Sequence, residues 1–150
     1  MLQLRKEPAM SAALLRQESP QPMYVVKLHN SAYTLDPYRE RLESQGLKVM
    51  DGESYEATLD LAMEYHPVLF VVHDDPAGGI DALRWLQIQH TAPQGWMATT
   101  PLIILADESR MPELRREELP DRVLVLQRRA DTLNRLGYVT RALLNLWDPV

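Results

Sequence analysis

Five short apolar runs, separated by segments with the apolar spacing of helices, constrain the fold of this 150-residue chain most strongly. The runs are rich in Val, Ile and Leu, and they occupy residues 24–28, 47–50, 68–72, 102–105 and 123–126. Continuous apolar runs that alternate with helices are typical of a parallel sheet whose two faces are both covered. We therefore predict an α/β fold of three layers, in which helices cover both faces of a five-stranded parallel sheet.

The segments between these runs carry residues that begin and end helices. Gly46 is placed just past the end of the first helix, and Ser54 is placed to cap the start of the second. Pro67 follows the second helix, because proline cannot continue a helix. The remaining helices are predicted over residues 79–90, 111–119 and 132–147.

The segment after the third helix, residues 91–100, is interpreted as a loop. Trp96 and Met97 lie in this loop, and two interpretations are open for them. In the first, they are an exposed anchor for a partner, since aromatic side chains are enriched at interfaces. In the second, the loop folds back and they cover the third helix. The buried positions of the third helix are predicted to be Ile80, Leu83 and Leu86, with Trp85 as a further candidate.

The charge balance disfavours nucleic acid as a direct partner. The chain has 16 Lys and Arg against 21 Asp and Glu, which gives a net charge of -5 and a pI near 5.3. Surfaces that bind nucleic acid carry an excess of basic residues instead. The chain has no cysteine, which excludes disulfides and thiolate zinc sites and fits a reducing compartment. We expect a cytoplasmic protein.

The apolar stretches are too short for a membrane protein, because none approaches the ~20 residues that cross a bilayer. Residues 1–22 mix charged residues, Ser, Gln and three prolines, and we predict a disordered or weakly helical N-terminal extension there. One folded domain is predicted over residues 23–150, which is an ordinary domain length.

The run at residues 68–72 ends in His73, Asp74, Asp75 and Pro76, and this end is the candidate functional site. In open α/β sheets, ligands bind beyond the carboxyl ends of the strands. Asp74 is the candidate phosphoacceptor. The alternative is that Asp74 and Asp75 form a turn before Pro76, where Asp binds its own backbone, and we favour this turn.

A transition-metal site is a further alternative at the same end of the sheet. Imidazole and carboxylate groups are ligands for zinc, and the candidate ligands are His29, His73, Asp74 and Asp75. Sequence spacing does not establish their geometry, and we expect neither a metal nor another cofactor. Lys27, inside the first run, is interpreted as an edge or snorkelling lysine.

Arg128 and Arg129 follow the fifth run. A guanidinium binds anions in a bidentate manner, so an anion site is one interpretation. We favour a charged strand end that pairs with Asp107.

Five segments, in their order and spacing, resemble the receiver domain of bacterial two-component response regulators. They are residues 41–49 (RLESQGLKV), 51–57 (DGESYEA), 66–72 (HPVLFVV), 79–83 (GIDAL) and 141–144 (RALL). The resemblance covers residues 23–147. It implies a flavodoxin-like sheet with the strand order 2-1-3-4-5.

Receivers phosphorylate one of their own aspartates, and the resemblance implies where the participating groups would lie. Two acids after the first strand and an acceptor aspartate after the third hold Mg²⁺, while a hydroxyl after the fourth strand and a lysine after the fifth contact the phosphoryl group. In this chain His29 and Asn30 occupy the positions of the two acids, and His73 occupies that of the acceptor. Ala106 occupies the position of the hydroxyl, and Arg128 or Arg129 that of the lysine. Asp74 lies one place beyond the acceptor position.

These replacements imply a degenerate receiver, or pseudo-receiver. We predict a signalling module that is not an enzyme and that contacts a protein partner without conventional aspartyl phosphorylation. A homodimer through the fourth and fifth helices is an open alternative, because the sequence does not reveal the oligomeric state. One alternative is a divergent receiver still phosphorylated at Asp74. Another is a ligand- or metal-binding α/β domain, although Gly78 and Gly79 do not make a Gly-x-Gly-x-x-Gly phosphate loop.

Overall fold

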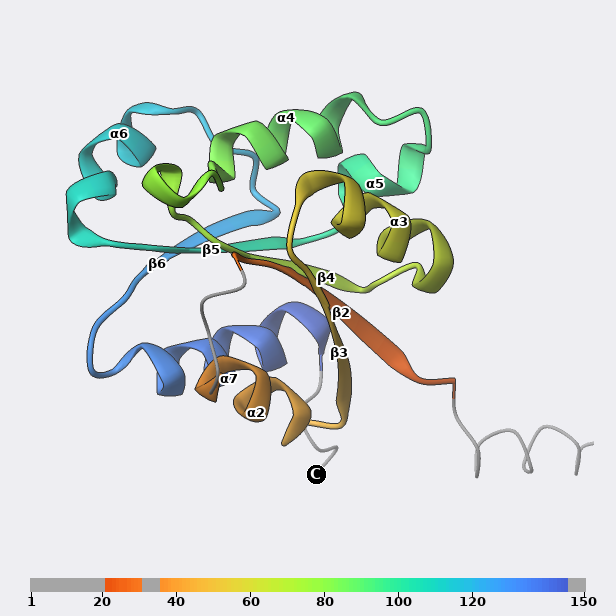
Figure 1. Cartoon of the computed structure of the whole chain (residues 1–150). Helices are drawn as coiled ribbons and strands as arrows, with labels where there is room; N and C mark the ends of the chain where they lie inside the picture. The colour runs from red at the N-terminus through yellow and green to blue at the C-terminus, as the bar shows by residue number, and fades with distance from the viewer. Residues whose placement is uncertain (1–20, 31–35, 146–150) are drawn as a thin grey trace, which may run out of the picture.

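The computed structural model describes residues 21–30 and 36–145, which form a five-stranded parallel sheet with helices on both faces (Figure 1). The strands are β2 (Met23–Leu28), β3 (Leu47–Gly52), β4 (Leu69–His73), β5 (Leu102–Ala106) and β6 (Val123–Gln127). Their order across the sheet is β3-β2-β4-β5-β6. The flavodoxin-like order 2-1-3-4-5 is therefore confirmed, with β3 and β6 at the edges of the described sheet.

The helices divide into two layers (Figure 1). On one face lie α2 (Pro37–Glu43) and α7 (Thr132–Leu144); on the other lie α3 (Tyr55–Tyr65), α4 (Ala82–Thr91), α5 (Gly95–Thr99) and α6 (Met111–Arg116). Successive residues of a strand point to opposite faces of a sheet. Val25 and Val71 accordingly belong to the apolar cluster that includes Leu42 of α2, whereas Val26 and Val72 belong to the cluster on the α3–α4 side.

The strand register brings the carboxyl ends of neighbouring strands together. Lys27 of β2 lies opposite Asp51 of β3 and Val71 of β4, and His73 lies opposite Leu105 of β5. All these pairs are parallel, so the residues that end or follow each strand gather at one edge of the sheet. This edge, called the carboxyl edge below, holds the site residues that the sequence predicts.

The predicted boundaries of the first two helices are confirmed. The Ser54 hydroxyl accepts a hydrogen bond from the Ala57 amide at 3.0 Å and caps α3. His66 ends α3 with a left-handed φ of 47°, directly before Pro67. Gly46 has a φ of 85°, a conformation that favours glycine, just past the end of α2.

The third predicted helix begins later than expected. α4 starts at Ala82 rather than at residue 79, and before it lies a separate 3-10 turn, η1 (Pro76–Gly78), which Gly79 follows with a φ of 94°. Asp81 then caps α4 by accepting a hydrogen bond from the Leu83 amide at 2.9 Å. The predicted start was too early because Gly79 ends η1 and Asp81 is the N-cap of α4, so that residues 79–81 connect the turn to the helix.

The buried face of α4 agrees with the prediction at Trp85 and Ile80 but not at Leu83 and Leu86. Trp85 is fully buried, with its ring centroid 5.2 Å from that of Phe70. Ile80 is buried as predicted, but it precedes the helix. Leu83 and Leu86 are half-buried, and they line a groove described below.

Residues 91–100 are not a plain loop, because they contain α5. Met97 is fully buried, and Trp96 is half-buried with its ring stacked on His66 at a centroid distance of 4.5 Å. The interpretation as an exposed anchor is therefore wrong. The segment covers apolar surface on the α3–α4 side of the sheet, as the other interpretation proposed.

The last two helices are shorter than predicted. α6 ends at Arg116, and α7 ends at Leu144, where Asn145 adopts a left-handed φ of 56°. Trp147 and residues 1–20 of the extension predicted over residues 1–22 lie outside the described residues. In the described part of the chain, no helix has the length and apolar character needed to cross a membrane.

Candidate functional site

Two charge networks lie at the carboxyl edge, on opposite faces of the sheet. The Asp74 network comprises Asp74, Asp81, Arg110 and Glu113 on the α4–α6 side. The Lys27 network comprises Lys27, His29, Asp36, Arg39 and Asp51 on the α2 side. The networks are separate because His73 and Asp74 are consecutive, so that their side chains leave β4 in different directions.

The carboxylate of Asp74 is fully engaged within the protein. Arg110 donates to Asp74 through Nε at 2.6 Å and through Nη2 at 3.1 Å, which is a bidentate arrangement. The Ala82 amide at the start of α4 donates a third hydrogen bond, at 2.8 Å. The side chain of Asp74 has no exposed surface. The interpretation of Asp74 as part of a solvated turn is therefore wrong.

Arg110 belongs to η2 (Glu108–Arg110), the turn between β5 and α6. Its Nη2 also reaches Asp81 at 2.9 Å, and its Nη1 reaches Glu113 at 2.6 Å. The hydrogen bond to Asp74, together with the charges of these acids, raises the pKa of Arg110. One guanidinium thus ties the turn after β5 to the end of β4 and to the start of α4.

Asp75 does occupy the turn that the sequence predicts. It caps η1 by accepting a hydrogen bond from the Gly78 amide at 3.1 Å. Its other carboxylate oxygen accepts a hydrogen bond from Asn30 at 2.5 Å. A Cβ on Gly78 would lie 2.3 Å from Asp75 Oδ2 and 2.6 Å from Asn30 Nδ2, so glycine is required for this close approach.

The Lys27 network surrounds a buried ammonium group. The side chain of Lys27 has no exposed surface; it pairs with Asp36 and lies 3.6 Å from Asp51. Asp36 also caps α2, since it accepts from the amide of Arg39 at 3.1 Å. Lys27 lies on the interior strand β2, so its interpretation as an edge or snorkelling lysine is wrong.

His29 joins this network through Asp51. Its Nε2 lies 3.1 Å from Asp51 Oδ1, and this hydrogen bond raises the pKa of His29 despite the opposing effect of burial. Burial acts to raise the pKa of Asp51, but the hydrogen bond with His29 and the charges of Lys27 and Arg39 outweigh it, so that this pKa is lowered. Both shifts favour the charged forms of the pair.

His73 lies beside the same network but is held neutral. Its ring centroid is 5.7 Å from that of His29 and 5.2 Å from that of Tyr38. Burial, followed by the charges of Lys27 and Arg128, lowers the pKa of His73 to about 2. The four metal ligands proposed from the sequence therefore do not assemble: His29 and His73 are neighbours, while Asp74 and Asp75 are bound elsewhere.

A different set of potential metal ligands is formed by His29, Asp36 and Asp51, whose donor atoms lie within 4.8 Å of one another. Mg²⁺ prefers oxygen ligands and keeps several waters. Here the Lys27 ammonium already pairs with Asp36 and lies near Asp51, so a second cation would meet its charge. These residues do not fit Mg²⁺.

The positions after β5 and β6 also hold no phosphoryl-binding pair of a hydroxyl and a lysine. Ala106 is fully buried at the end of β5. Arg128 pairs with Asp107 at 2.9 Å, as predicted, and its Nη2 donates to the Asp74 carbonyl at 2.8 Å. Arg129 is exposed and lies 3.5 Å from Asp131.

The sequence matches no protein-family model and no curated protein. Solved structures are similar in fold. The chemotaxis response regulator CheY4 of Vibrio cholerae matches with a TM-score of 0.65 at 12% identity, over 82% of this chain and 99% of that one. A response regulator receiver protein from Sinorhizobium medicae WSM419 matches with a TM-score of 0.64 at 12% identity, over 85% and 98% of the two chains. The receiver domain of the hybrid histidine kinase CckA matches with a TM-score of 0.58 at 17% identity, over 81% and 98%.

The chain has the receiver-domain fold. At sequence identities this low, the structural similarity establishes the fold alone. The chemistry of the site follows from the residues of this chain. Within the receiver fold, sequence reasoning located the carboxyl edge but missed Arg110, Asp36, Asp51 and Asp81. One signal was available: a lysine inside an apolar strand requires counter-charges, and Asp51 ends the next strand along the chain.

Proposed function

We propose that this chain is a receiver-fold signalling module that acts through protein contacts and is not phosphorylated on an aspartate. The observation that carries the proposal is the state of Asp74. A phosphoacceptor needs a carboxylate oxygen that is free to attack and open to the donor. Both oxygens of Asp74 accept hydrogen bonds, and the side chain has no exposed surface.

The cations of the carboxyl edge support the same proposal. In phosphoryl transfer, bound metal ions and basic groups stabilise the negative charge of the transferred group. Here Lys27, Arg110 and Arg128 are each paired with carboxylates of the chain itself. An incoming phosphoryl group would have to displace these internal partners.

The region around β6 is the surface that we propose for protein contacts, including a homodimer through α6 and α7. β6 is an edge strand on which Leu124 and Val125 are half-buried. On α7, Tyr138 is 64% exposed, and among the described residues it is the large hydrophobic residue that is exposed. Exposed aromatic side chains often anchor interfaces.

A small-molecule phosphodonor tests the loss of phosphorylation. The protein is incubated with acetyl phosphate and Mg²⁺ and then analysed by intact mass spectrometry, with a conventional receiver domain treated in parallel. We expect a phosphoryl adduct on the conventional receiver and none on this chain. A Mg²⁺-dependent adduct that persists in Asp75→Asn and disappears in Asp74→Asn would contradict the proposal.

The contact surface is tested by oligomeric state. We expect light scattering after gel filtration to show a dimer that Tyr138→Glu dissociates, because the new charge would be buried at the interface. Arg141→Gln is the matched control, since Arg141 is exposed on the same helix. A wild-type monomer at all concentrations would remove the homodimer and leave a different protein as the partner.

A further inference from the structure

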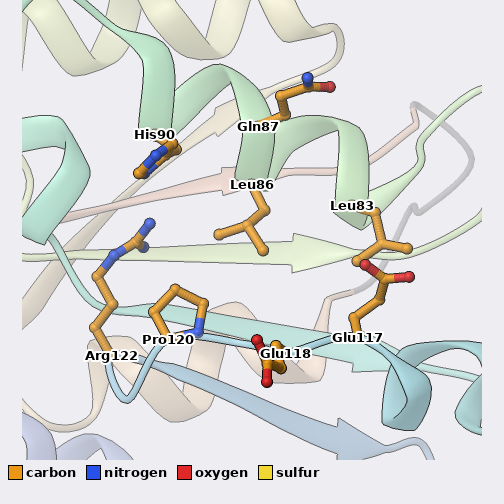
Figure 2. A pocket seen from close by; sticks show the side chains of 8 residues that line it. All are labelled: Leu83, Leu86, Gln87, His90, Glu117, Glu118, Pro120 and Arg122. Carbon is orange, nitrogen blue, oxygen red and sulfur yellow. The ribbon is translucent and has the colours of Figure 1, made fainter.

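A groove of about 440 Å³ lies along α4, and none of the residues that line it belongs to either charge network of the carboxyl edge. It separates α4 from residues 117–122, the segment between α6 and β6 (Figure 2). Leu86 points from α4 toward Pro120 on the opposite wall, which makes the middle of the groove apolar (Figure 2). Its volume is in the range of small-molecule sites, ~300–1,000 Å³.

The two ends of this groove carry opposite charge. Arg122 and His90 lie at the end near the amino termini of β5 and β6, where Arg122 directly precedes Val123. Glu117 and Glu118 lie toward the other end (Figure 2). A ligand that matches this pattern has its negative charge at one end of an apolar body.

Arg122 is half-buried, and its guanidinium differs from those of Arg110 and Arg128 in its partners. Its Nη1 donates to the Thr100 carbonyl at 3.1 Å, but its Nη2 is buried with no hydrogen-bond partner. Within residues 21–30 and 36–145, no carboxylate pairs with it. Burial lowers the pKa of Arg122, which reports an uncompensated loss of hydration. A desolvated charge of this kind gains free energy when an anion approaches it.

We infer that this groove binds a small amphiphilic carboxylate, with the carboxylate at Arg122 and the apolar chain over Leu86 and Pro120. A planar carboxylate matches the planar guanidinium in shape and charge. Glu117 and Glu118 repel a second negative charge, so the groove favours a monocarboxylate over a dianionic phosphate ester. This site is independent of the proposed signalling function, because it uses none of the carboxyl-edge residues.

The test uses three probes that share one apolar chain: hexanoate, hexan-1-ol and hexyl phosphate. Each is titrated into the ¹⁵N-labelled full chain while amide shifts are followed by NMR. We expect saturable shifts for hexanoate at the amides of Leu86, Gln87 and Arg122, with a dissociation constant on the order of 10 mM, as is usual for a fragment of this size. Hexan-1-ol and hexyl phosphate should bind more weakly.

Two variants locate the interaction. Arg122→Gln should weaken hexanoate binding about tenfold or more, since the charge-assisted hydrogen bond is lost. Arg116→Gln is the control, because Arg116 is exposed nearby but does not line the groove. If Arg122→Gln does not fold, Leu86→Glu places a negative charge in the groove and should abolish the shifts.

Three results would overturn the inference. The first is the absence of saturable shifts at the groove with hexanoate. The second is equal binding of hexanoate and hexan-1-ol, or unchanged hexanoate binding in a folded Arg122→Gln or Leu86→Glu variant. The third is tighter binding of hexyl phosphate than of hexanoate, which would show that the groove selects phosphate.

Discussion

The cations of the carboxyl edge and the cation of the α4 groove differ in their partners. At the carboxyl edge, Lys27 and Arg110 are each bound by acids of the chain itself. In the groove, Arg122 has a carbonyl partner but no acid among the described residues. Internal pairing removes the attraction of a cation for an outside anion. At the carboxyl edge, where receivers carry out phosphorylation, Lys27 and Arg110 are therefore neutralised by carboxylates of the chain. The cation without a carboxylate partner among the described residues is Arg122, in the groove.

The largest effect should come from Lys27→Met. This substitution leaves Asp36 and Asp51, which are only partly exposed, without their shared cation. Breaking a buried ion pair from one side costs about 3 kcal/mol, and we expect the free energy of unfolding to fall by about that amount. Urea denaturation measures it. Lys48→Met on the exposed side of β3 is the control and should change stability by less than about 0.5 kcal/mol.

If Lys27→Met lowers the free energy of unfolding by no more than Lys48→Met does, the contrast between the carboxyl edge and the groove does not hold. That result would mean that the acids around Lys27 are satisfied by water rather than by the ammonium group.

Arg110→Ala should have the next largest effect. Asp74 keeps its hydrogen bond from the Ala82 amide but loses the bidentate guanidinium, so we expect a loss of about 2 kcal/mol in urea denaturation. Arg115→Ala, on the exposed side of α6, serves as the matched control. The losses of Arg110→Ala and Lys27→Met should add in the double variant, because the two networks lie on opposite faces of the sheet. Strong coupling between them would show instead one continuous network.

His73 should make the carboxyl edge sensitive to acid. Its pKa is about 2 in the folded protein, against about 6.5 when unfolded, so only the unfolded state binds the proton as the pH falls below 6.5. We expect the free energy of unfolding to fall by about 1.4 kcal/mol per pH unit between about pH 6 and 4.5, and His73→Phe should remove that slope. Denaturation series at several pH values measure both.

The titration of His29 does not contribute to the fall in stability between about pH 6 and 4.5. Its pKa is raised, so it is protonated in both states below pH 6.5, and its stabilising contribution is lost only as the pH rises through the folded pKa. His90→Gln is the control for His73, since His90 is exposed. An unchanged acid slope in His73→Phe would show that His73 is hydrated in solution.

The smallest effect should come from Arg122→Gln. The substitution removes one hydrogen bond to the Thr100 carbonyl but also removes a desolvated charge, so stability should change by less than about 1 kcal/mol. Thermal and urea denaturation measure this value. A loss comparable to that of Arg110→Ala would mean that Arg122 is a structural cation, and the contrast between the two regions would disappear.

Sequence reasoning was most successful for elements that depend on neighbouring residues. The Ser54 cap, the turn at Gly46 and the five strands follow from local backbone chemistry and from apolar periodicity. It was less successful for α5, because Met97 and Trp96 are held by distant parts of the α3–α4 side rather than by a helical pattern of their own.

The candidate site shows the same division. The sequence placed His29, Asp74 and Arg128 at one edge, since strand ends in a parallel sheet converge. The sequence did not predict that Asp74 pairs with Arg110, because the two residues are 36 positions apart in the chain. Arg110 reaches Asp74 from the turn after β5, and local sequence patterns do not determine the direction of that turn.

The sequence by itself determined the layers of this protein and the order in which strands and helices alternate. The tertiary structure alone decided that Asp74 is bound by Arg110, that Lys27 is enclosed by acids, and that Arg122 is left without one. Periodicity and capping act over a few residues, whereas the state of a buried charge depends on which distant groups the fold brings within a few ångströms of it.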